Sequence, residues 1–245
     1  MQLIPERMAQ IGSLKKGNHK PNGHEMCVME AVAYVAGEAW SDQPQCSCPV
    51  ITAFMVSWND SLPNDAERDR LLKNLIPEII GTRATKSVET KRATLAADWL
   101  IRTHTPAWLR LAKLETQAAL LESLPEITDF AQCPSLMPAL QAVRIDANAA
   151  RAAAGDAARD AAWAAAWDAA GAAAWAAARD AARDAAWAAA RDAAWDAAGD
   201  AAWDAAWDAA RAAAGDALKP TIAQLQISAV ALVRKMITVK EGNES

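Results

Sequence analysis

Four side chains near the start of the chain have the chemistry to bind a metal ion. His24, Cys27, Cys46 and Cys48 supply an imidazole and three thiols, the ligand types that tetrahedral zinc prefers. Cys46 and Cys48 are separated by a single residue, whereas cysteine pairs in zinc knuckles are usually separated by two or more. Buried structural thiols are therefore the first interpretation of these cysteines. A zinc site, and redox or nucleophilic chemistry, are the alternatives that the sequence leaves open.

Carboxylates of the same region could serve in acid–base chemistry, but their pattern favours a simpler role. Glu30 lies among apolar residues of a predicted helix, where burial would raise its pKa, and Glu38 and Asp42 follow it. Solvated acids at the ends of helices and loops explain the same residues. We therefore predict no catalytic residue and no cofactor beyond the zinc alternative. A small metal-binding module or metal-dependent enzyme in the N-terminal domain, with the rest of the chain as an appendage, stays open as the alternative to a structural protein.

The elements that must position these side chains are predicted to be helices. Pro49 suits the first turn of a helix, Asn64 can cap another, and Gly37 and Gly81 can end the helices before them. No stretch of the chain alternates apolar and polar residues as a strand would. Apolar residues recur at helical spacing over residues 24–36, 49–58, 64–80, 84–102, 106–123 and 221–240.

The composition changes sharply near residue 147, and this change predicts the domain organisation. We expect an all-α protein in which a helical domain, residues 24–135, follows a polar N-terminal tail, residues 1–23. A long helix at residues 136–218 contains the low-complexity part of the chain. A C-terminal helix at residues 220–240 then folds back or packs alongside.

Residues 24–130 carry a pattern that resembles a known family. The run Cys-x-x-Glu-Ala-Val-Ala-Tyr-Val-Ala-Gly-Glu-x-Trp-Ser-Asp-x-Pro-x-Cys at residues 27–46 is similar to a family of uncharacterised bacterial and phage proteins. The similarity extends through Ser57-Trp-Asn-Asp60 and Thr105-Pro-Ala-Trp-Leu109. The resemblance implies a folded N-terminal domain that alanine-rich tails follow in some members, and it implies no activity.

Between Arg151 and Leu218 the chain is built from seventeen consecutive tetrads of the form (Trp/Arg/Gly)-(Asp/Ala)-Ala-Ala, and Leu218 is the only departure from this form. Ala provides 39 of these 68 residues, and seven of the eleven Trp stand in the first position of a tetrad. Ala is the strongest helix former, so a helical rod of roughly 100 Å is expected. Large apolar indole rings must be covered, and an isolated helix cannot cover them. The tract therefore predicts a structural role.

The order of the tetrads favours self-association. Reflection about residue 185 pairs most first positions with an identical residue, as an antiparallel two-fold contact requires. We expect a homo-oligomer or scaffold assembled through this coiled-coil-like rod. Neutral expansion of a DNA repeat, and recognition of an external surface such as ice, are the alternatives. The residues predicted to form the interface are Trp163, Trp167, Trp175, Trp195, Trp203 and Trp207.

Charge and hydropathy restrict the remaining possibilities. The net charge of −5 comes from the repeat, and the rest of the chain is balanced, so binding to nucleic acid is not expected. Charged residues interrupt every apolar run before it reaches the length of a membrane span. Four Cys in a chain of 245 residues do not form a disulfide framework. We therefore expect a cytoplasmic protein whose partner is another copy of itself.

Overall fold

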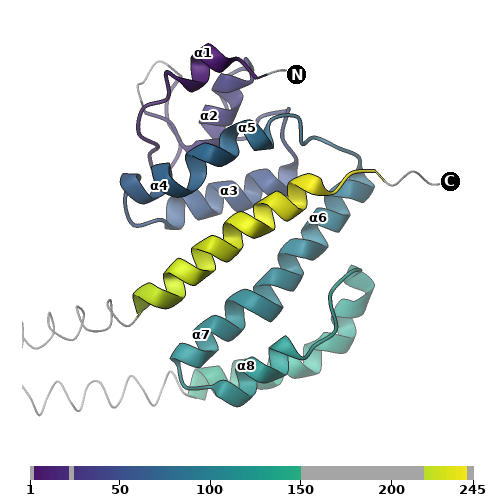
Figure 1. The fold of residues 1–245 in the computed structure, drawn as a ribbon. Helices are drawn as coiled ribbons and strands as arrows, with labels where there is room; N and C mark the ends of the chain where they lie inside the picture. Colours follow the sequence, from purple (N-terminus) through teal and green to yellow (C-terminus); the bar gives the residue numbers. More distant parts are fainter. Residues whose placement is uncertain (1–2, 22–24, 150–217, 242–245) are drawn as a thin grey trace, which may run out of the picture. The chain divides into compact units, whose positions relative to one another are not determined.

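The computed structural model describes residues 3–21, 25–149 and 218–241, and every regular element in these ranges is a helix (Figure 1). The predicted all-α class is confirmed. Residues 133–149 and 218–238 are also helical. The other helices are α1 (Pro5–Met8), α2 (Val28–Val35), α3 (Pro49–Ser61), α4 (Asp65–Leu72), η1 (Lys73–Leu75), α5 (Ile76–Ile79), α6 (Lys86–Trp99), η2 (Leu100–His104, a π-helix), α7 (Thr105–Leu111), α8 (Glu115–Glu122) and η3 (Phe130–Gln132).

Local signals set the ends of these helices. Pro49 occupies the first turn of α3, and the Asn64 side chain accepts a hydrogen bond from the Glu67 N–H at the start of α4, as predicted. The helix predicted from residue 24 begins at residue 28, because Cys27 is its N-cap and forms a capping box with Glu30. Cysteine is an unusual cap, so composition alone did not indicate this start.

The chain folds into two compact units. Unit 1 is made by the described residues of Met1–Ala107, Ala119–Met137 and Ala223–Ser245, and unit 2 by those of Trp108–Ala118 and Pro138–Ile222. The main hydrophobic core lies in unit 1. Its largest fully buried side chains come from the N-terminal segment, from α2, α3, α4, η1 and α5, and from the last helix. They include Leu14, Met29, Ile51, Met55, Leu72, Leu75, Ile76, Ile79 and Met236.

The C-terminal helix is an integral part of this core. Leu232, Val233 and Met236 are buried in it, and Figure 1 shows the helix running alongside α6. Arg92 of α6, which is 3% exposed, donates through Nε to the Met236 carbonyl over 2.8 Å and through Nη2 to that of Val239 over 2.9 Å. The helix predicted at residues 220–240 thus packs against the domain rather than extending away from it.

The segment predicted as a polar tail is also packed against unit 1. In its described part, residues 3–21, the Leu14 side chain is fully buried. Two backbone N–H groups of the segment donate to acids of other elements, Leu14 to Asp69 and Gly17 to Asp60, each over 2.8 Å. These residues are held against unit 1, because carboxylates distant in sequence accept hydrogen bonds from their backbone N–H groups.

The helix at residues 133–149 leads toward the repeat. Gln117 of α8 donates to Asp146 of this helix over 2.9 Å, and both residues belong to unit 2. The long helix predicted over residues 136–218 is described only up to residue 149 and at residue 218. The tetrads, with all six Trp residues predicted to self-associate, lie outside the described residues.

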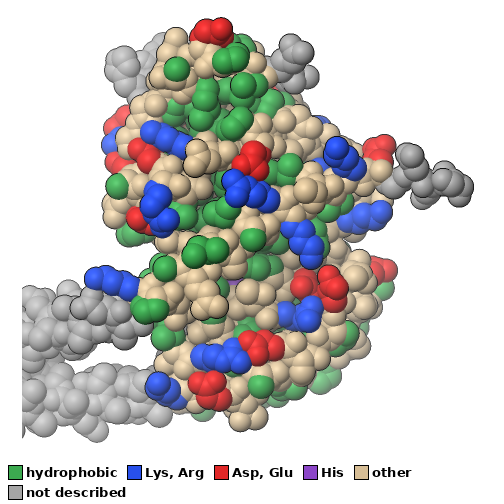
Figure 2. Space-filling model, viewed as in Figure 1, with side chains coloured by type: hydrophobic (Ala, Val, Ile, Leu, Met, Phe, Trp, Pro, Cys, Tyr) green, Lys and Arg blue, Asp and Glu red, His purple; other side chains and the backbone are tan. Residues whose placement is uncertain are grey.

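The described surface carries charges of both signs. Figure 2 shows basic and acidic side chains interspersed among apolar ones on the face in view. This agrees with the balanced charge of the chain outside the repeat. Within the described residues, no helix has both the length and the apolar character that a membrane span needs.

Candidate functional site

The three described thiols of the predicted metal site are buried and sit at the ends of helices. Cys27 and Cys48 are the N-caps of α2 and α3, and Cys46 precedes Cys48 in the loop. Burial raises the pKa of Cys27 to about 12, and burial together with the Glu38 carboxylate raises that of Cys46 to about 11. These two thiols are therefore protonated at neutral pH, which suits structural burial better than nucleophilic chemistry.

The fourth predicted ligand, His24, lies outside the described residues. Among the residues that are described, no three or more His, Cys, Asp or Glu side chains come together as a group that could hold a metal ion. The zinc site with Cys27, Cys46 and Cys48 stays a prediction. The geometry that is described assigns these cysteines to the core and to helix caps.

Glu30 is the centre of a buried hydrogen-bond cluster. It is 1% exposed, and its Oε1 accepts from the His19 backbone N–H over 2.6 Å and from Trp40 Nε1 over 3.2 Å. Its Oε2 accepts from the Cys27 N–H over 2.7 Å and contacts His19 Nδ1 over 2.9 Å. A carboxylate surrounded by donors in this way fastens the N-terminal segment to α2. It has no access to a substrate, so the acid–base role considered for Glu30 is not supported.

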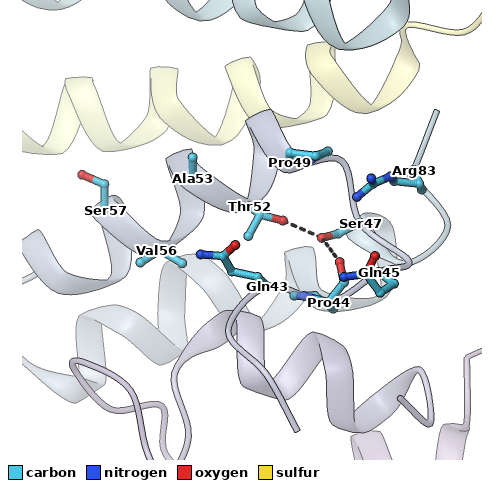
Figure 3. A pocket seen from close by; sticks show the side chains of 10 residues that line it. All are labelled: Gln43, Pro44, Gln45, Ser47, Pro49, Thr52, Ala53, Val56, Ser57 and Arg83. Atoms are coloured by element: carbon cyan, nitrogen blue, oxygen red, sulfur yellow. Dashed lines mark hydrogen bonds between the residues drawn. The ribbon is translucent and has the colours of Figure 1, made fainter. Parts of the chain in front are cut away.

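An open pocket lies between the loop at residues 43–47 and the exposed side of α3 (Figure 3). Its volume is about 300 Å³, at the lower end of the range of ligand sites. Figure 3 shows Arg83 at one end, Ser57 and Val56 at the other, and Gln43 between them. The pocket is lined by Gln43, Pro44, Gln45, Ser47, Pro49, Thr52, Ala53, Val56, Ser57 and Arg83.

Buried hydroxyl groups hold the walls of this pocket. The Ser47 hydroxyl contacts that of Thr52 over 2.5 Å and donates to the Pro44 carbonyl over 3.2 Å, which ties the loop to α3. Thr82 Oγ1 accepts from the Cys48 N–H over 3.0 Å and donates to a carbonyl at the end of α5. These bonds join the loop, α3 and the segment that follows α5 into one frame before any ligand binds.

A second pocket of about 350 Å³ shares Gln43, Pro44 and Gln45 with the first. It is lined also by Glu38, whose Oε2 accepts from the Gln45 N–H over 2.6 Å. Glu38 therefore holds the loop in position rather than forming a carboxylate cluster with Glu30. Asp42 lies in the same loop and lines neither pocket.

The polar groups that line the first pocket are suited to binding a ligand. The contacts of Ser47 and Thr52 are with each other and with the Pro44 carbonyl, so neither hydroxyl has a base to activate it. The exposed polar groups of its lining are Arg83, the carboxamides of Gln43 and Gln45, and the Ser57 hydroxyl. Sequence reasoning missed Arg83, Gln43 and Gln45, because single exposed polar residues in loops carry no periodic or motif signal.

Comparisons with protein families, with curated proteins and with solved structures find no match to this chain. The resemblance noted for residues 24–130 therefore stays a prediction.

Proposed function

We propose that the protein is an assembly module, in which a folded all-α domain presents the Ala/Trp repeat for association with further copies of the chain. The repeat itself lies outside the described residues, and the proposal uses its sequence together with the way its two ends are held. The observation that carries the proposal is the burial of the C-terminal helix in the core of unit 1. Because of that helix, the repeat is an insertion fixed at both ends rather than an appendage.

The tryptophans supply the driving force. Each buried Trp removes about 150–250 Å² from water, and at about 25 cal/mol per Å² seven of them represent tens of kcal/mol in gross terms. The Ala residues beside them permit close approach of a neighbouring backbone. The repeat also carries 11 Asp and 6 Arg, which keep the unassembled chain soluble.

The anchoring of the ends restricts how the repeat can be used. A single straight helix of 68 residues would be roughly 100 Å long. The chain leaves unit 1 after Met137 and re-enters it at Ala223. A unit of about 150 residues is about 40 Å across, and the flanking helical residues add about 25 Å. The proposed assembly therefore uses a chain that turns back near residue 185 rather than one straight rod.

This arrangement would explain why the first-position residues are nearly symmetric about residue 185. A turn near residue 185 would place Trp163 beside Trp207 and Trp167 beside Trp203, with like residues facing one another. Two antiparallel arms cover only one side of each indole ring, and two arms from a second copy would cover the rest, as in a four-helix bundle. The proposed product is therefore a closed dimer rather than an open filament.

The test is the solution mass of the intact chain, measured by size exclusion with light scattering. Changing Trp163, Trp167, Trp203 and Trp207 to Ala should convert the oligomer into a monomer while the helical circular dichroism of the domain persists. The matched control changes four first-position arginines to Ala and should leave the oligomer intact. The control residues are Arg159, Arg179, Arg191 and Arg211.

Two results would refute the proposal. A wild-type chain that is monomeric at all accessible concentrations would mean that no copy of the chain covers the tryptophans. An oligomer that survives the four Trp substitutions would mean that the interface lies elsewhere.

A further inference from the structure

The pocket between α3 and the loop at residues 43–47 has one end that attracts negative charge. The side chain of Arg83 is exposed at this end, and its guanidinium has no hydrogen-bond or ion-pair partner within the described part of the chain. Its backbone N–H donates to the Cys46 carbonyl over 3.1 Å, which fixes the position from which the side chain projects. A guanidinium presents donors in a planar fork that matches a carboxylate.

The rest of the pocket suits a short extended chain. Along α3 it extends from Pro49 to Ser57, which is about 12 Å at the rise of a helix and corresponds to three or four extended residues. Ala53 and Val56 provide an apolar wall. The carboxamide of Gln43 stands midway along the pocket, where it can both donate to and accept from a peptide group.

We propose that this pocket binds the free C-terminal end of a peptide, with the terminal carboxylate paired to Arg83 and the preceding residues lying along α3. The frame made by Ser47, Thr52 and Thr82 is complete without a ligand, so binding loses little entropy to ordering of the walls. This inference concerns unit 1 alone and does not depend on assembly through the repeat.

The test uses two probes that differ only in charge at the C-terminus, N-acetyl-Ala-Ala with a free carboxylate and the same dipeptide with a terminal amide. Binding to the full-length chain is followed by the NMR signals of the Gln43 and Gln45 side-chain amides and of the Ala53 methyl group. The acid should shift these signals saturably, and the amide should bind at least tenfold more weakly. Arg83→Gln should weaken binding of the acid at least tenfold.

Lys86→Gln is the matched control, because it removes the same charge three residues away, outside the pocket lining. It should change the affinity for the acid by less than twofold. Ala53→Leu should abolish binding, because the larger side chain would occupy the pocket while the charge at Arg83 stays in place.

The proposal is overturned if neither probe gives a saturable shift, or if the acid and the amide bind equally well. It is also overturned if Lys86→Gln weakens binding as much as Arg83→Gln, since that result would mean general attraction to a basic surface. Unchanged circular dichroism and thermal midpoints establish that each variant is folded.

Discussion

Substitution of Arg92 by Met tests how firmly the C-terminal helix is built into the domain. The guanidinium donates to the carbonyls of Met236 and Val239 in the C-terminal segment, and its Nη1 donates to that of Thr82 after α5. Met retains most of the apolar stem of Arg92, so packing changes little, while all three carbonyls lose a charged donor. The substitution therefore isolates the hydrogen bonds from the packing.

The size of the effect follows from these contacts. Hydrogen bonds to a charged group contribute about 1.5–3 kcal/mol each, and three that share one donor group are not additive. We expect Arg92→Met to lower the free energy of unfolding by about 4 kcal/mol, a large part of the 5–15 kcal/mol typical of a domain. Urea unfolding followed by far-ultraviolet circular dichroism measures this change.

Arg234→Met is the control on the same helix. Arg234 pairs with Glu78 over 2.9 Å, but its side chain is 53% exposed, so its loss should lower the free energy of unfolding far less than the loss of Arg92. An Arg92→Met variant that unfolds within 1 kcal/mol of wild type, or no earlier than Arg234→Met, would refute the reasoning. The helix would then not be held by the contacts described, and the repeat would lose its second anchor.

Three further predictions concern the N-terminal half of the chain. Glu30→Gln should lower the free energy of unfolding in urea by about 3 kcal/mol, because an amide nitrogen would face the N–H donors that the buried carboxylate accepts. Although burial alone would raise it, the pKa of Asp69 is lowered by hydrogen bonds from a backbone N–H, a lysine and a serine. The stability that Asp69 provides is therefore present above its ordinary pKa near 4 and is lost as the pH falls below it. The thermal midpoint of the Asp69→Asn variant should therefore fall less than that of wild type between pH 6 and pH 2.5. The pKa of Cys27 is raised to about 12 and that of Cys46 to about 11, and the Cys48 side chain is fully buried. Only the half-buried Cys133 should therefore react quickly with a disulfide reagent at pH 8, and Cys133→Ser should remove the fast phase.

The sequence predicted those parts of the fold that depend on neighbouring residues. Proline at the first turn of α3 and the Asn64 cap of α4 act within four residues of themselves, so the pattern locates them correctly. The all-α class follows from the helical spacing of apolar residues. The start of α2 was placed too early because Cys27 caps it with a thiol, which is not among the usual capping groups.

Features that depend on distant residues were not predictable in this way. Residues 11–20 are mostly polar, and only the positions of Asp60 and Asp69 in the folded chain show that the backbone groups of Leu14 and Gly17 have partners. The pocket exists because Arg83 lies next to the loop at residues 43–47. The Thr82 hydroxyl holds the two segments together by accepting a hydrogen bond from the Cys48 N–H, 34 residues away in sequence. The cysteine content of the sequence suggested a metal site, but it could not show that burial raises the pKa of the Cys27 and Cys46 thiols.

Because both ends of the repeat are anchored, its length and its composition can be considered separately. Closing an unstructured loop of 68 residues would cost the domain on the order of 4 kcal/mol, and doubling the loop would add only about 0.6 kcal/mol. Length alone is therefore tolerable, and expansion of a repeat could account for it. Seven Trp residues are different, since a loop that is merely tolerated would be served by Ala, Gly and Asp without them. Their presence in the first position of so many tetrads favours a surface that becomes buried when the chain assembles.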